Sequence, residues 1–545
     1  MSTVDETDTP YALANEPDVA AVFEAYAARR PEQPLVVDED RMVTARQMLH
    51  VVQTLQHNLG LAGLEPGEAV GVLLPNGWRW LAATLALVRG GYIAVPLNTW
   101  YRSAELRSAR GKSRLRAVIS QSEINGRDYV SLLAGSSLLE PDLDARYRGA
   151  FLWDGELPTG LSTVPTRMPA SVVTSHEDTA MYVFTSGSSA EPKVVVLRHG
   201  DLMRNGYAMG QRLGVEVGDR IWFAAPLFFG LGCANAVTVA LTHGVTLCLQ
   251  ERFDPARSAA FIEKHQCTVF YGVGPIARGL AKEQAVNPRD LSCLTKGVIG
   301  VTAEDKRVAI DKLGLSNARS VYGLTECYGL AAMTEPGDDA AALVHTQGRA
   351  LPTQAIRCVD RMTGDVVAEG SADRLGEIQL RGCTTPGYLN NDEANAASFT
   401  PDGWFRTGDL GWIDYEQRLH FAGRVKEVVK INGITISPAE VEAFITEHPN
   451  VEDAYVFGWP IDDTEEKLCC AVVLNSSDRK TDEEIGQWLG HWLRERISSY
   501  KVPVRFVVIE EGKVPMTATG KISKRLIGEQ FIGLQASAEE NTCVR

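Results

Sequence analysis

Apolar residues near the start of the chain follow two different periods. Between residues 19 and 29, Val19, Val22, Phe23 and Tyr26 recur at the spacing of one helix face. Short continuous apolar runs, typical of buried strands, follow at residues 35–37, 69–74 and 93–97. Helical stretches lie between these runs. The pattern therefore predicts parallel sheets covered by helices.

Polar residues before several apolar stretches predict where helices begin. Thr44 is placed to cap a helix that runs through Leu59. Asp201 is a plausible cap for a helix that begins at His199. Further along, Ser437 followed by Pro438 is typical of a capped helix start with proline in the first turn.

The rest of the chain divides into regions of different character. Residues 134–178 are rich in Gly, Ser, Pro and Asp and predict a connector. Residues 221–225, 268–273 and 296–300 predict further strands. Residues 351–420 carry short strand signals and glycine turns, which predict a small β subdomain. The fold class is α/β (mixed α+β), with helix-covered sheets, a β subdomain and an α/β region at the C-terminus.

Composition narrows the class of protein. At 545 residues, the chain should form more than one domain. A net charge of −15 argues against a dedicated binder of nucleic acid or anionic membranes. The N-terminus is acidic and polar and no run of 18 apolar residues exists, so we expect a cytoplasmic protein without membrane insertion. The ten cysteines are scattered, which favours buried reduced thiols.

One loop has the composition of a phosphate site. Apolar residues lead to Thr185, Ser186–Ser189 follow, and Lys193 precedes another apolar run, so the stretch predicts strand, tight loop and strand. Hydroxyls and bare amides can wrap a phosphate chain, and a lysine adds mobile positive charge. The loop is not a Walker A motif, in which a helix follows the lysine. A plain surface turn is the alternative, since Ser/Gly/Pro clusters usually form turns.

Four further motifs follow this loop in order: Tyr322-Gly323-Leu324-Thr325-Glu326, Trp404-Phe405-Arg406-Thr407-Gly408-Asp409, Gly423-Arg424-Val425-Lys426-Glu427 and Pro515-Met516-Thr517-Ala518-Thr519-Gly520-Lys521. Together with the loop, the series resembles the adenylate-forming superfamily over roughly residues 20 to 530. That superfamily includes acyl-CoA ligases, carrier-protein adenylation domains, luciferases and amide synthetases. Each motif alone has an ordinary explanation, such as a helix cap, a turn or a surface residue.

The resemblance implies an ATP site and its Mg²⁺. Thr325 would contact the α-phosphate, Glu326 would ligate Mg²⁺, Asp409 would bind the ribose hydroxyls and Arg424 would support that contact. The remaining nucleotide-binding positions implied are Thr185, Ser186, Gly187, Ser188, Ser189 and Lys193 for the phosphates, and Val301, Thr302, Ala303, Tyr322 and Gly323 for the adenine.

The resemblance also implies an acid pocket, a catalytic lysine and a moving domain. Lys521 would bridge the substrate carboxylate and the α-phosphate. The domains implied are an N-terminal domain, residues 1–425, and a mobile C-terminal lid, residues 426–545. The acid pocket would contain Phe228, Phe229, Gly230 and Gly300, and the hinge and second-step residues would be Lys426, Lys430 and Gly433.

Two positions depart from the family pattern. Relatives usually carry glycine where this chain has Ala190 and Val194. A methyl group restricts the backbone of a tight loop, so the shape of the phosphate loop and the rate of the first step are open.

The reaction implied by the resemblance has two steps. A carboxylate attacks the α-phosphate of ATP, which releases pyrophosphate and forms an acyl-adenylate, and the acyl group then passes to an acceptor. Such chemistry needs no protein nucleophile, and the chain has no G-x-S-x-G elbow. We expect an aromatic, cyclic or medium-chain acid and coenzyme A as acceptor. An amine, a separate carrier protein and a catalytically silent nucleotide-binding relative are the alternatives.

Overall fold

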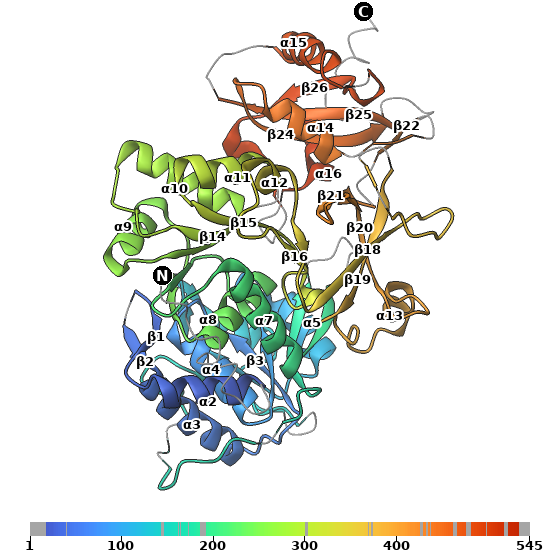
Figure 1. Cartoon of the computed structure of the whole chain (residues 1–545). Helices are drawn as coiled ribbons and strands as arrows, with labels where there is room; N and C mark the ends of the chain where they lie inside the picture. Colours follow the sequence, from blue (N-terminus) through green and yellow to red (C-terminus); the bar gives the residue numbers. More distant parts are fainter. Residues whose placement is uncertain are drawn as a thin grey trace, which may run out of the picture. The chain divides into compact units, whose positions relative to one another are not determined.

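The computed structural model describes residues 18–39, 41–142, 146–161, 163, 165–172, 174–185, 192–299, 303–368, 370–371, 374–425, 429–431, 434–436, 438–460, 466–475, 481–497, 499–516 and 522–532. The chain forms two compact units (Figure 1). The large unit comprises Met1–Val301, Asp305–Ile356 and Leu380–Phe405, and the small unit comprises Thr302–Glu304, Arg357–Gln379 and Arg406–Arg545. The mixed α/β class predicted from the sequence is confirmed. The predicted boundary after residue 425 stays a prediction.

Two sheets form the frame of the large unit. One has nine strands, in the order β17 (Arg349–Ala350), β16 (Ala332–Met333), β15 (Asn317–Tyr322), β14 (Lys296–Ile299), β13 (Val269–Tyr271), β11 (Arg220–Phe223), β12 (Thr246–Leu249), β1 (Pro34–Val37) and β2 (Met42–Thr44). The other has six, in the order β10 (Lys193–Arg198), β9 (Thr179–Thr185), β4 (Ile93–Pro96), β3 (Ala69–Leu73), β5 (Ala117–Ser120) and β8 (Ala150–Leu152). Most neighbours run parallel, as the alternating pattern predicts.

Helices pack on these sheets through their apolar faces. Helix α2 (Val19–Arg29) contacts α3 (Ala45–Leu61), α4 (Trp78–Arg89), α7 (His199–Leu213) and α8 (Val237–His243), and α7 and α8 lie side by side (Figure 1). Buried residues from both sheets and these helices form one continuous hydrophobic core. The described part of the unit also contains the α-helices α5 (Ser103–Ser113), α6 (Tyr129–Gly135), α9 (Pro255–His265), α10 (Gly274–Val286), α12 (Ala340–His345) and α13 (Asp392–Ser398), and α11 (Ala303–Arg307) has residues in both units.

Two predicted helix starts have different outcomes. Thr44 caps α3 through a capping box: its hydroxyl accepts from the Gln47 N–H at 3.2 Å, and Gln47 Oε1 accepts from the Thr44 N–H at 2.9 Å. Asp201 is not a cap. Strand β10 runs directly into α7, whose N-cap is Arg198, so Asp201 lies in the first turn and pairs with Arg204.

The remaining strands form smaller sheets. The predicted β subdomain is a four-stranded sheet of β18 (Gln354–Val359), β19 (Gly376–Gly382), β20 (Phe405–Ile413) and β21 (Leu419–Arg424). Next come the hairpin β22 (Val429–Ile431) and β23 (Ile434–Ile436), and a three-stranded sheet of β24 (Val451–Pro460), β25 (Glu466–Leu474) and β26 (Arg505–Val508). Helices α14 (Pro438–Thr446), α15 (Asp482–Arg494) and α16 (Lys524–Ile527) accompany the three-stranded sheet.

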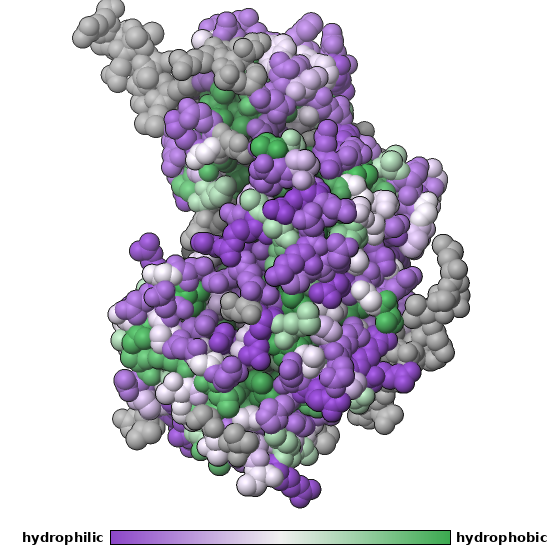
Figure 2. Space-filling view, turned by 90° about the vertical axis from the view of Figure 1, so that its left-hand side faces the viewer, coloured by the Kyte–Doolittle hydropathy of each residue, from purple (hydrophilic) through white to green (hydrophobic). Residues whose placement is uncertain are grey.

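Side chains on the three-stranded sheet alternate between two apolar clusters. On β24, Ala454 and Val456 join a cluster with α14 and α15, whereas Tyr455 and Phe457 join a second cluster on the opposite face. Hydrophilic residues predominate on the face of the molecule shown in Figure 2, with apolar residues interspersed among them. Within the described part of the chain, no helix has both the length and the apolar character needed to cross a bilayer.

Candidate functional site

The predicted ATP and acid residues of the large unit follow the carboxyl ends of its strands. Thr185 is the last residue of β9, and Tyr322 is the last residue of β15. Phe228, Phe229 and Gly230 come shortly after β11. In open α/β sheets, ligands bind beyond these ends, so each of these motifs lies at a strand end where a ligand can be expected.

The phosphate loop joins β9 to β10 in a hairpin. Thr185 and Lys193 are direct partners in its register, so they flank the loop on both sides. Lys193 Nζ lies 4.5 Å from the centroid of the Tyr388 ring. Val194 is only 3% exposed, so its side chain is buried. The predicted phosphate ligands Ser186, Gly187, Ser188 and Ser189, and the departure at Ala190, lie outside the described residues.

Thr325 and Glu326 lie in a short 3₁₀ turn, Thr325–Cys327, and not at the cap of an α-helix. The Tyr388 hydroxyl donates to Glu326 Oε1 at 2.9 Å. The Glu326 carbonyl accepts from the Thr385 N–H at 2.7 Å. Tyr328 follows with φ of 58°, a left-handed conformation that folds the chain back after the turn. The carboxylate predicted to ligate Mg²⁺ is therefore fixed through both its side chain and its backbone.

Buried side-chain amides donate hydrogen bonds to the backbone carbonyls of this turn. Asn205 of α7 is fully buried, and its Nδ2 donates to the carbonyls of Cys327, Tyr328 and Leu330 at 3.3, 3.1 and 2.9 Å. Gln354 Nε2 also donates to the Cys327 carbonyl, at 3.3 Å. These bonds satisfy carbonyls that a left-handed turn leaves without ladder partners.

Two residues of this segment, Gly323 and Cys327, have structural roles. A Cβ at Gly323 would lie 1.9 Å from the Gly329 carbonyl oxygen, so glycine is required there by close approach. Burial raises the pKa of the Cys327 thiol to about 12, and its Sγ donates to the Leu324 carbonyl at 3.1 Å. This cysteine is a protonated structural group beside Glu326, and it is not placed to act as a nucleophile.

Aromatic rings cluster beside the turn. Phe228 and Phe229 have ring centroids 4.6 Å apart, and Trp100 packs edge-on against them at 5.5 and 6.0 Å. A Cβ at the next residue, Gly230, would lie 2.8 Å from Thr325 Oγ1. The residue that follows the aromatic pair in the chain therefore lies against the hydroxyl predicted to contact the α-phosphate. Sequence reasoning did not include Trp100 in this group.

The small unit carries the predicted ribose site. Asp409 of β20 and Arg424 of β21 are direct cross-strand partners, with Arg424 Nε 3.4 Å from Asp409 Oδ1. Gly408 precedes Asp409 with φ of 71°, and the Asp409 N–H donates to the Thr407 hydroxyl at 3.0 Å. The Thr-Gly-Asp spacing thus sets a turned backbone that a side chain at Gly408 would strain. Asp409 and Arg424 therefore lie together, and their assignment to the ribose stays a prediction.

Other predicted residues have little or no described environment. Gly300, Val301, Thr302, Lys426, Gly433 and Lys521 lie outside the described residues. Ala303 begins α11, and Lys430 lies in β22 opposite Thr435. Tyr322 is buried at the end of β15. Their assignments to adenine, hinge, second step and catalysis remain predictions.

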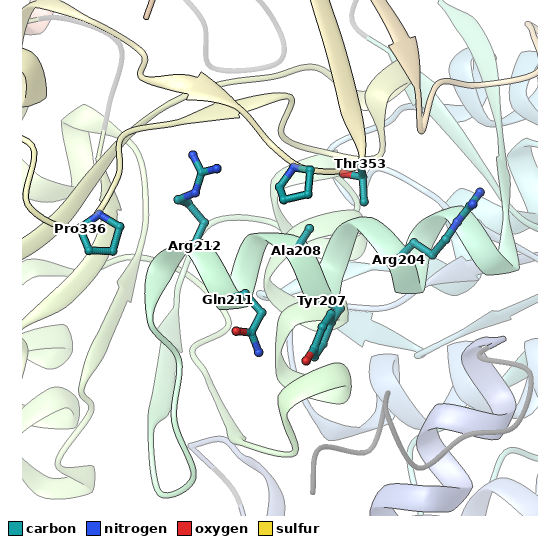
Figure 3. A pocket seen from close by; sticks show the side chains of 8 residues that line it. Arg204, Tyr207, Ala208, Gln211, Arg212, Pro336 and Thr353 are labelled. Carbon is teal, nitrogen blue, oxygen red and sulfur yellow. The ribbon is translucent and has the colours of Figure 1, made fainter. Parts of the chain in front are cut away.

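A separate hollow of about 420 Å³ lies along α7 (Figure 3). Its two arginines are already engaged: Arg204 pairs with Asp201, and Arg212 donates to the Met333 carbonyl at 2.9 Å. The hollow contains none of the predicted site residues. Its lining residues are Arg204, Tyr207, Ala208, Gln211, Arg212, Pro336, Pro352 and Thr353.

The residues missed from the sequence act across long separations. Tyr388 bonds to a residue 62 positions earlier, and Asn205 bonds to carbonyls 122 to 125 positions later. Neither residue lies in the quoted motifs, and local spacing cannot pair residues that only the folded sheets bring together. The one signal near Tyr388 is the preceding Gly387, which indicates a turn but no role.

Comparison with known proteins identifies the same regions. Residues 23–389 match the AMP-binding enzyme family, and residues 440–521 match the AMP-binding enzyme C-terminal domain. The chain is 27% identical to the mitochondrial medium-chain acyl-CoA ligase of Rattus norvegicus, covering 94% of this chain and 87% of that protein. It is 28% identical to the medium-chain fatty-acid–CoA ligase of Escherichia coli (strain K12), covering 95% of this chain and 91% of that protein.

Solved structures share the fold. The ATP-bound MatB from Rhodopseudomonas palustris superimposes with a TM-score of 0.82 at 22% identity, covering 94% of this chain and 99% of that one. The anthranilate CoA ligase AuaEII in complex with anthranoyl-AMP gives 0.84 at 23% identity, covering 98% of this chain and 100% of that one. Because the family regions match residues 23–389 and 440–521, the chain belongs to the AMP-binding enzymes.

Proposed function

We propose that this protein is an ATP-dependent carboxylic acid ligase that forms an acyl-adenylate and transfers the acyl group to coenzyme A. One observation carries the proposal. Gly230, the residue after the paired rings of Phe228 and Phe229, approaches Thr325 so closely that a Cβ there would lie 2.8 Å from the hydroxyl assigned to the α-phosphate. An apolar acid bound there presents its carboxylate to the phosphorus atom, which is the geometry that the first step needs.

The charges of Lys193 and Glu326 suit the binding of a phosphate chain and its metal ion. Lys193 brings a positive charge beside the loop, and Glu326 brings a carboxylate held by Tyr388. A single fixed carboxylate fits Mg²⁺, a hard cation that binds oxygen ligands and keeps several waters. When bound, Mg²⁺ neutralises charge on the phosphate oxygens. In the small unit, Asp409 would accept hydrogen bonds from the ribose hydroxyls, with Arg424 Nε 3.4 Å from its carboxylate.

Lys521 supplies the main catalytic charge in this proposal, by bridging the substrate carboxylate and the α-phosphate. Removing one such group typically slows a reaction by about 10²–10³. Lys426, Lys430 and Gly433 serve the second step: the C-terminal residues turn about Lys426, and Gly433 lets the thiol arm approach the backbone closely. These roles rest on the motif matches in the sequence.

The aromatic cluster supports an aromatic, cyclic or medium-chain acid. Trp100, Phe228 and Phe229 offer ring edges and faces, which favour a flat or flexible apolar body. Coenzyme A is the proposed acceptor because relatives named medium-chain acyl-CoA ligase and medium-chain fatty-acid–CoA ligase match nearly the whole chain. No feature of the described residues favours an amine as acceptor over coenzyme A.

Mass spectrometry of reaction products tests the proposal. The protein is incubated with ATP, Mg²⁺, coenzyme A, a few simple amines and a mixed pool of aromatic, cyclic and aliphatic acids. An acyl-CoA identifies both the acid and the acceptor. An amide, or an acyl-adenylate that coenzyme A does not consume, would contradict the proposed second step. The absence of any adenylate with all acids would contradict the first step.

Three variants assign the roles. Lys521→Ala should lose most acyl-adenylate formation, Asp409→Ala should weaken ATP binding, and Lys430→Ala should mainly slow thioester formation. Lys513→Ala is a matched control, because Lys513 is a mostly exposed lysine paired with Glu510. Full acyl-adenylate formation by Lys521→Ala would remove that lysine from the mechanism.

A further inference from the structure

Tyr388 contacts two groups that the proposed function assigns to ATP and its metal. Its hydroxyl donates to Glu326 Oε1 at 2.9 Å. The face of its ring lies 4.5 Å from Lys193 Nζ, within the range of a cation–π contact. One side chain therefore holds an anion with its polar end and a cation with its aromatic face. Tyr388 is only 6% exposed, so both contacts are shielded from solvent.

The backbone around Tyr388 is fastened to the phosphate hairpin. The Leu389 N–H donates to the Val194 carbonyl at 2.9 Å, and the Val196 N–H donates to the Gly387 carbonyl at 3.2 Å. Tyr388 thus follows β10 like a short added strand, bridged to Val195. Its position relative to Lys193 is consequently set by the same strand that carries Lys193.

A side chain amide fixes Tyr388 from the other side. The Tyr388 N–H donates to Asn395 Oδ1 at 2.7 Å, and Asn395 Nδ2 donates back to the Tyr388 carbonyl at 2.9 Å. Asn395 lies in α13. Gly387 has φ of 147°, and a Cβ there would lie 2.8 Å from Asn395 Oδ1. The backbone of Tyr388 is thus fixed by both β10 and α13.

The hydrogen bond from the Tyr388 hydroxyl orients the Glu326 carboxylate and leaves other acceptor positions on it. A carboxylate has about four acceptor positions, so a hydrogen bond to one oxygen leaves capacity for a cation. Partners that orient a metal ligand typically change metal affinity about 10- to 100-fold when they are removed. The ring contact acts on a different group, the lysine that follows the phosphate loop.

We propose that Tyr388 is a positioning residue that sets the metal carboxylate Glu326 and the phosphate lysine Lys193 relative to each other. The inference rests on the proposed function, because it takes the assigned roles of those two residues as given. The hydroxyl governs how well Mg²⁺ is held, and the ring governs how well the phosphates of ATP are held. These two effects are separable by substitution.

Two variants separate them. Tyr388→Phe removes the hydroxyl and keeps the ring, and Tyr388→Leu removes both. Calorimetric titration with ATP in the presence of a chelator reads the phosphate contact, and titration of Mg²⁺ into the ATP complex reads the metal contact. Tyr388→Phe should bind Mg²⁺ about 10- to 100-fold more weakly while keeping the affinity for metal-free ATP. Tyr388→Leu should show the same loss and also weaken metal-free ATP.

Controls keep the test specific. Tyr415→Phe removes a hydroxyl from a tyrosine that is 81% exposed, and it should change neither titration. Thermal unfolding followed by circular dichroism shows whether each variant is folded. Unchanged Mg²⁺ binding in a folded Tyr388→Phe variant would overturn the proposal. Equal weakening of both titrations by Tyr388→Phe would also overturn it, because that result indicates a general loss of site structure.

The outcome is independent of the acid substrate. If the wild type binds ATP and Mg²⁺ but forms no product from any acid, the proposed function fails while the calorimetric comparison still decides the role of Tyr388. If the wild type does not bind ATP at all, both the proposed function and the role of Tyr388 are overturned.

Discussion

Gly230 is the residue at which the aromatic cluster meets the Thr325 turn. A Cβ there would lie 2.8 Å from Thr325 Oγ1, closer than real Cβ contacts allow. We predict that Gly230→Ala displaces the Thr325 hydroxyl and slows acyl-adenylate formation about 10²- to 10³-fold, the usual cost of losing one transition-state contact. Single-turnover formation of the adenylate measures this effect.

A matched glycine variant separates crowding from a general effect of alanine. Gly111 in α5 has no neighbour within 4 Å of a built Cβ. Gly111→Ala should leave the rate unchanged, and as a helix-interior change it should stabilise the protein slightly. An unchanged rate in Gly230→Ala would show that Thr325 does not need its present position.

His243 gives the fold a dependence on pH. It is 2% exposed and stacks on Tyr207 with ring centroids 5.2 Å apart. Burial lowers the pKa of His243 from 6.5 to about 4, so the folded state keeps the ring neutral. Between those two values the unfolded chain binds more protons, and stability therefore falls as the pH falls through this window. At pH 5 the loss relative to pH 7.5 is about 2 kcal/mol.

Urea unfolding at pH 7.5 and pH 5 measures this dependence. The variant His243→Gln cannot take up the proton, so it should lose about 2 kcal/mol less between the two pH values than the wild type. The matched control is His491→Gln, because the His491 side chain is 79% exposed. If His243→Gln keeps the wild-type difference in unfolding free energy between the two pH values, that difference arises from other titratable groups.

At the scale of elements, α7 supports the turn of the predicted catalytic residues Thr325 and Glu326 through the side chain of Asn205. Asn205 donates to three carbonyls of the segment after Thr325 and accepts from the Thr353 hydroxyl at 2.5 Å. We predict that Asn205→Leu leaves those carbonyls unsatisfied and lowers the free energy of unfolding by about 1–3 kcal/mol. It should also slow acyl-adenylate formation, because the turn that carries Glu326 loses its anchor.

A second position on the same helix provides the control for Asn205. Gln211 is exposed on α7, so Gln211→Leu should change neither stability nor rate by much. Urea unfolding and single-turnover kinetics are measured on both variants. A rate that stays at the wild-type level in a destabilised Asn205→Leu variant would show that the bonds stabilise the fold without positioning the turn.

Local signals account for the elements that the sequence predicted well. The helix at residues 19–29 and the Thr44 cap are confirmed, because apolar spacing and capping act within a few residues. Asp201 was misassigned because nothing local shows that β10 runs directly into α7 at Arg198. The supports of the site could not be predicted, since Asn205 and Tyr388 reach their partners only through the packed sheets.

At the scale of the whole molecule, the order of the motifs indicated the family, which the periodicity of apolar residues could not do. Five short motifs spread from Thr185 to Lys521 resemble one family. The large unit contains β9 in its six-stranded sheet and β11 and β15 in its nine-stranded sheet. The direct partners Asp409 and Arg424 lie in the other unit. Apolar patterns predicted the strands, but they carry no information on which strand ends become neighbours.

The two units lead to a prediction about the second step. Lys426 is the predicted pivot of the C-terminal residues, and a pivot must change its backbone dihedrals between the two half-reactions. Proline fixes φ near −65° and removes the N–H, so Lys426→Pro should hold the pivot in one state. We predict that acyl-adenylate formation continues while thioester formation from preformed adenylate falls about 100-fold, as expected for a misplaced reactive group.

Lys426→Ala keeps φ free and should retain both rates. Rapid-quench measurement of the two half-reactions decides the matter: equal rates in the proline and alanine variants would mean that the turn between half-reactions does not occur at this residue.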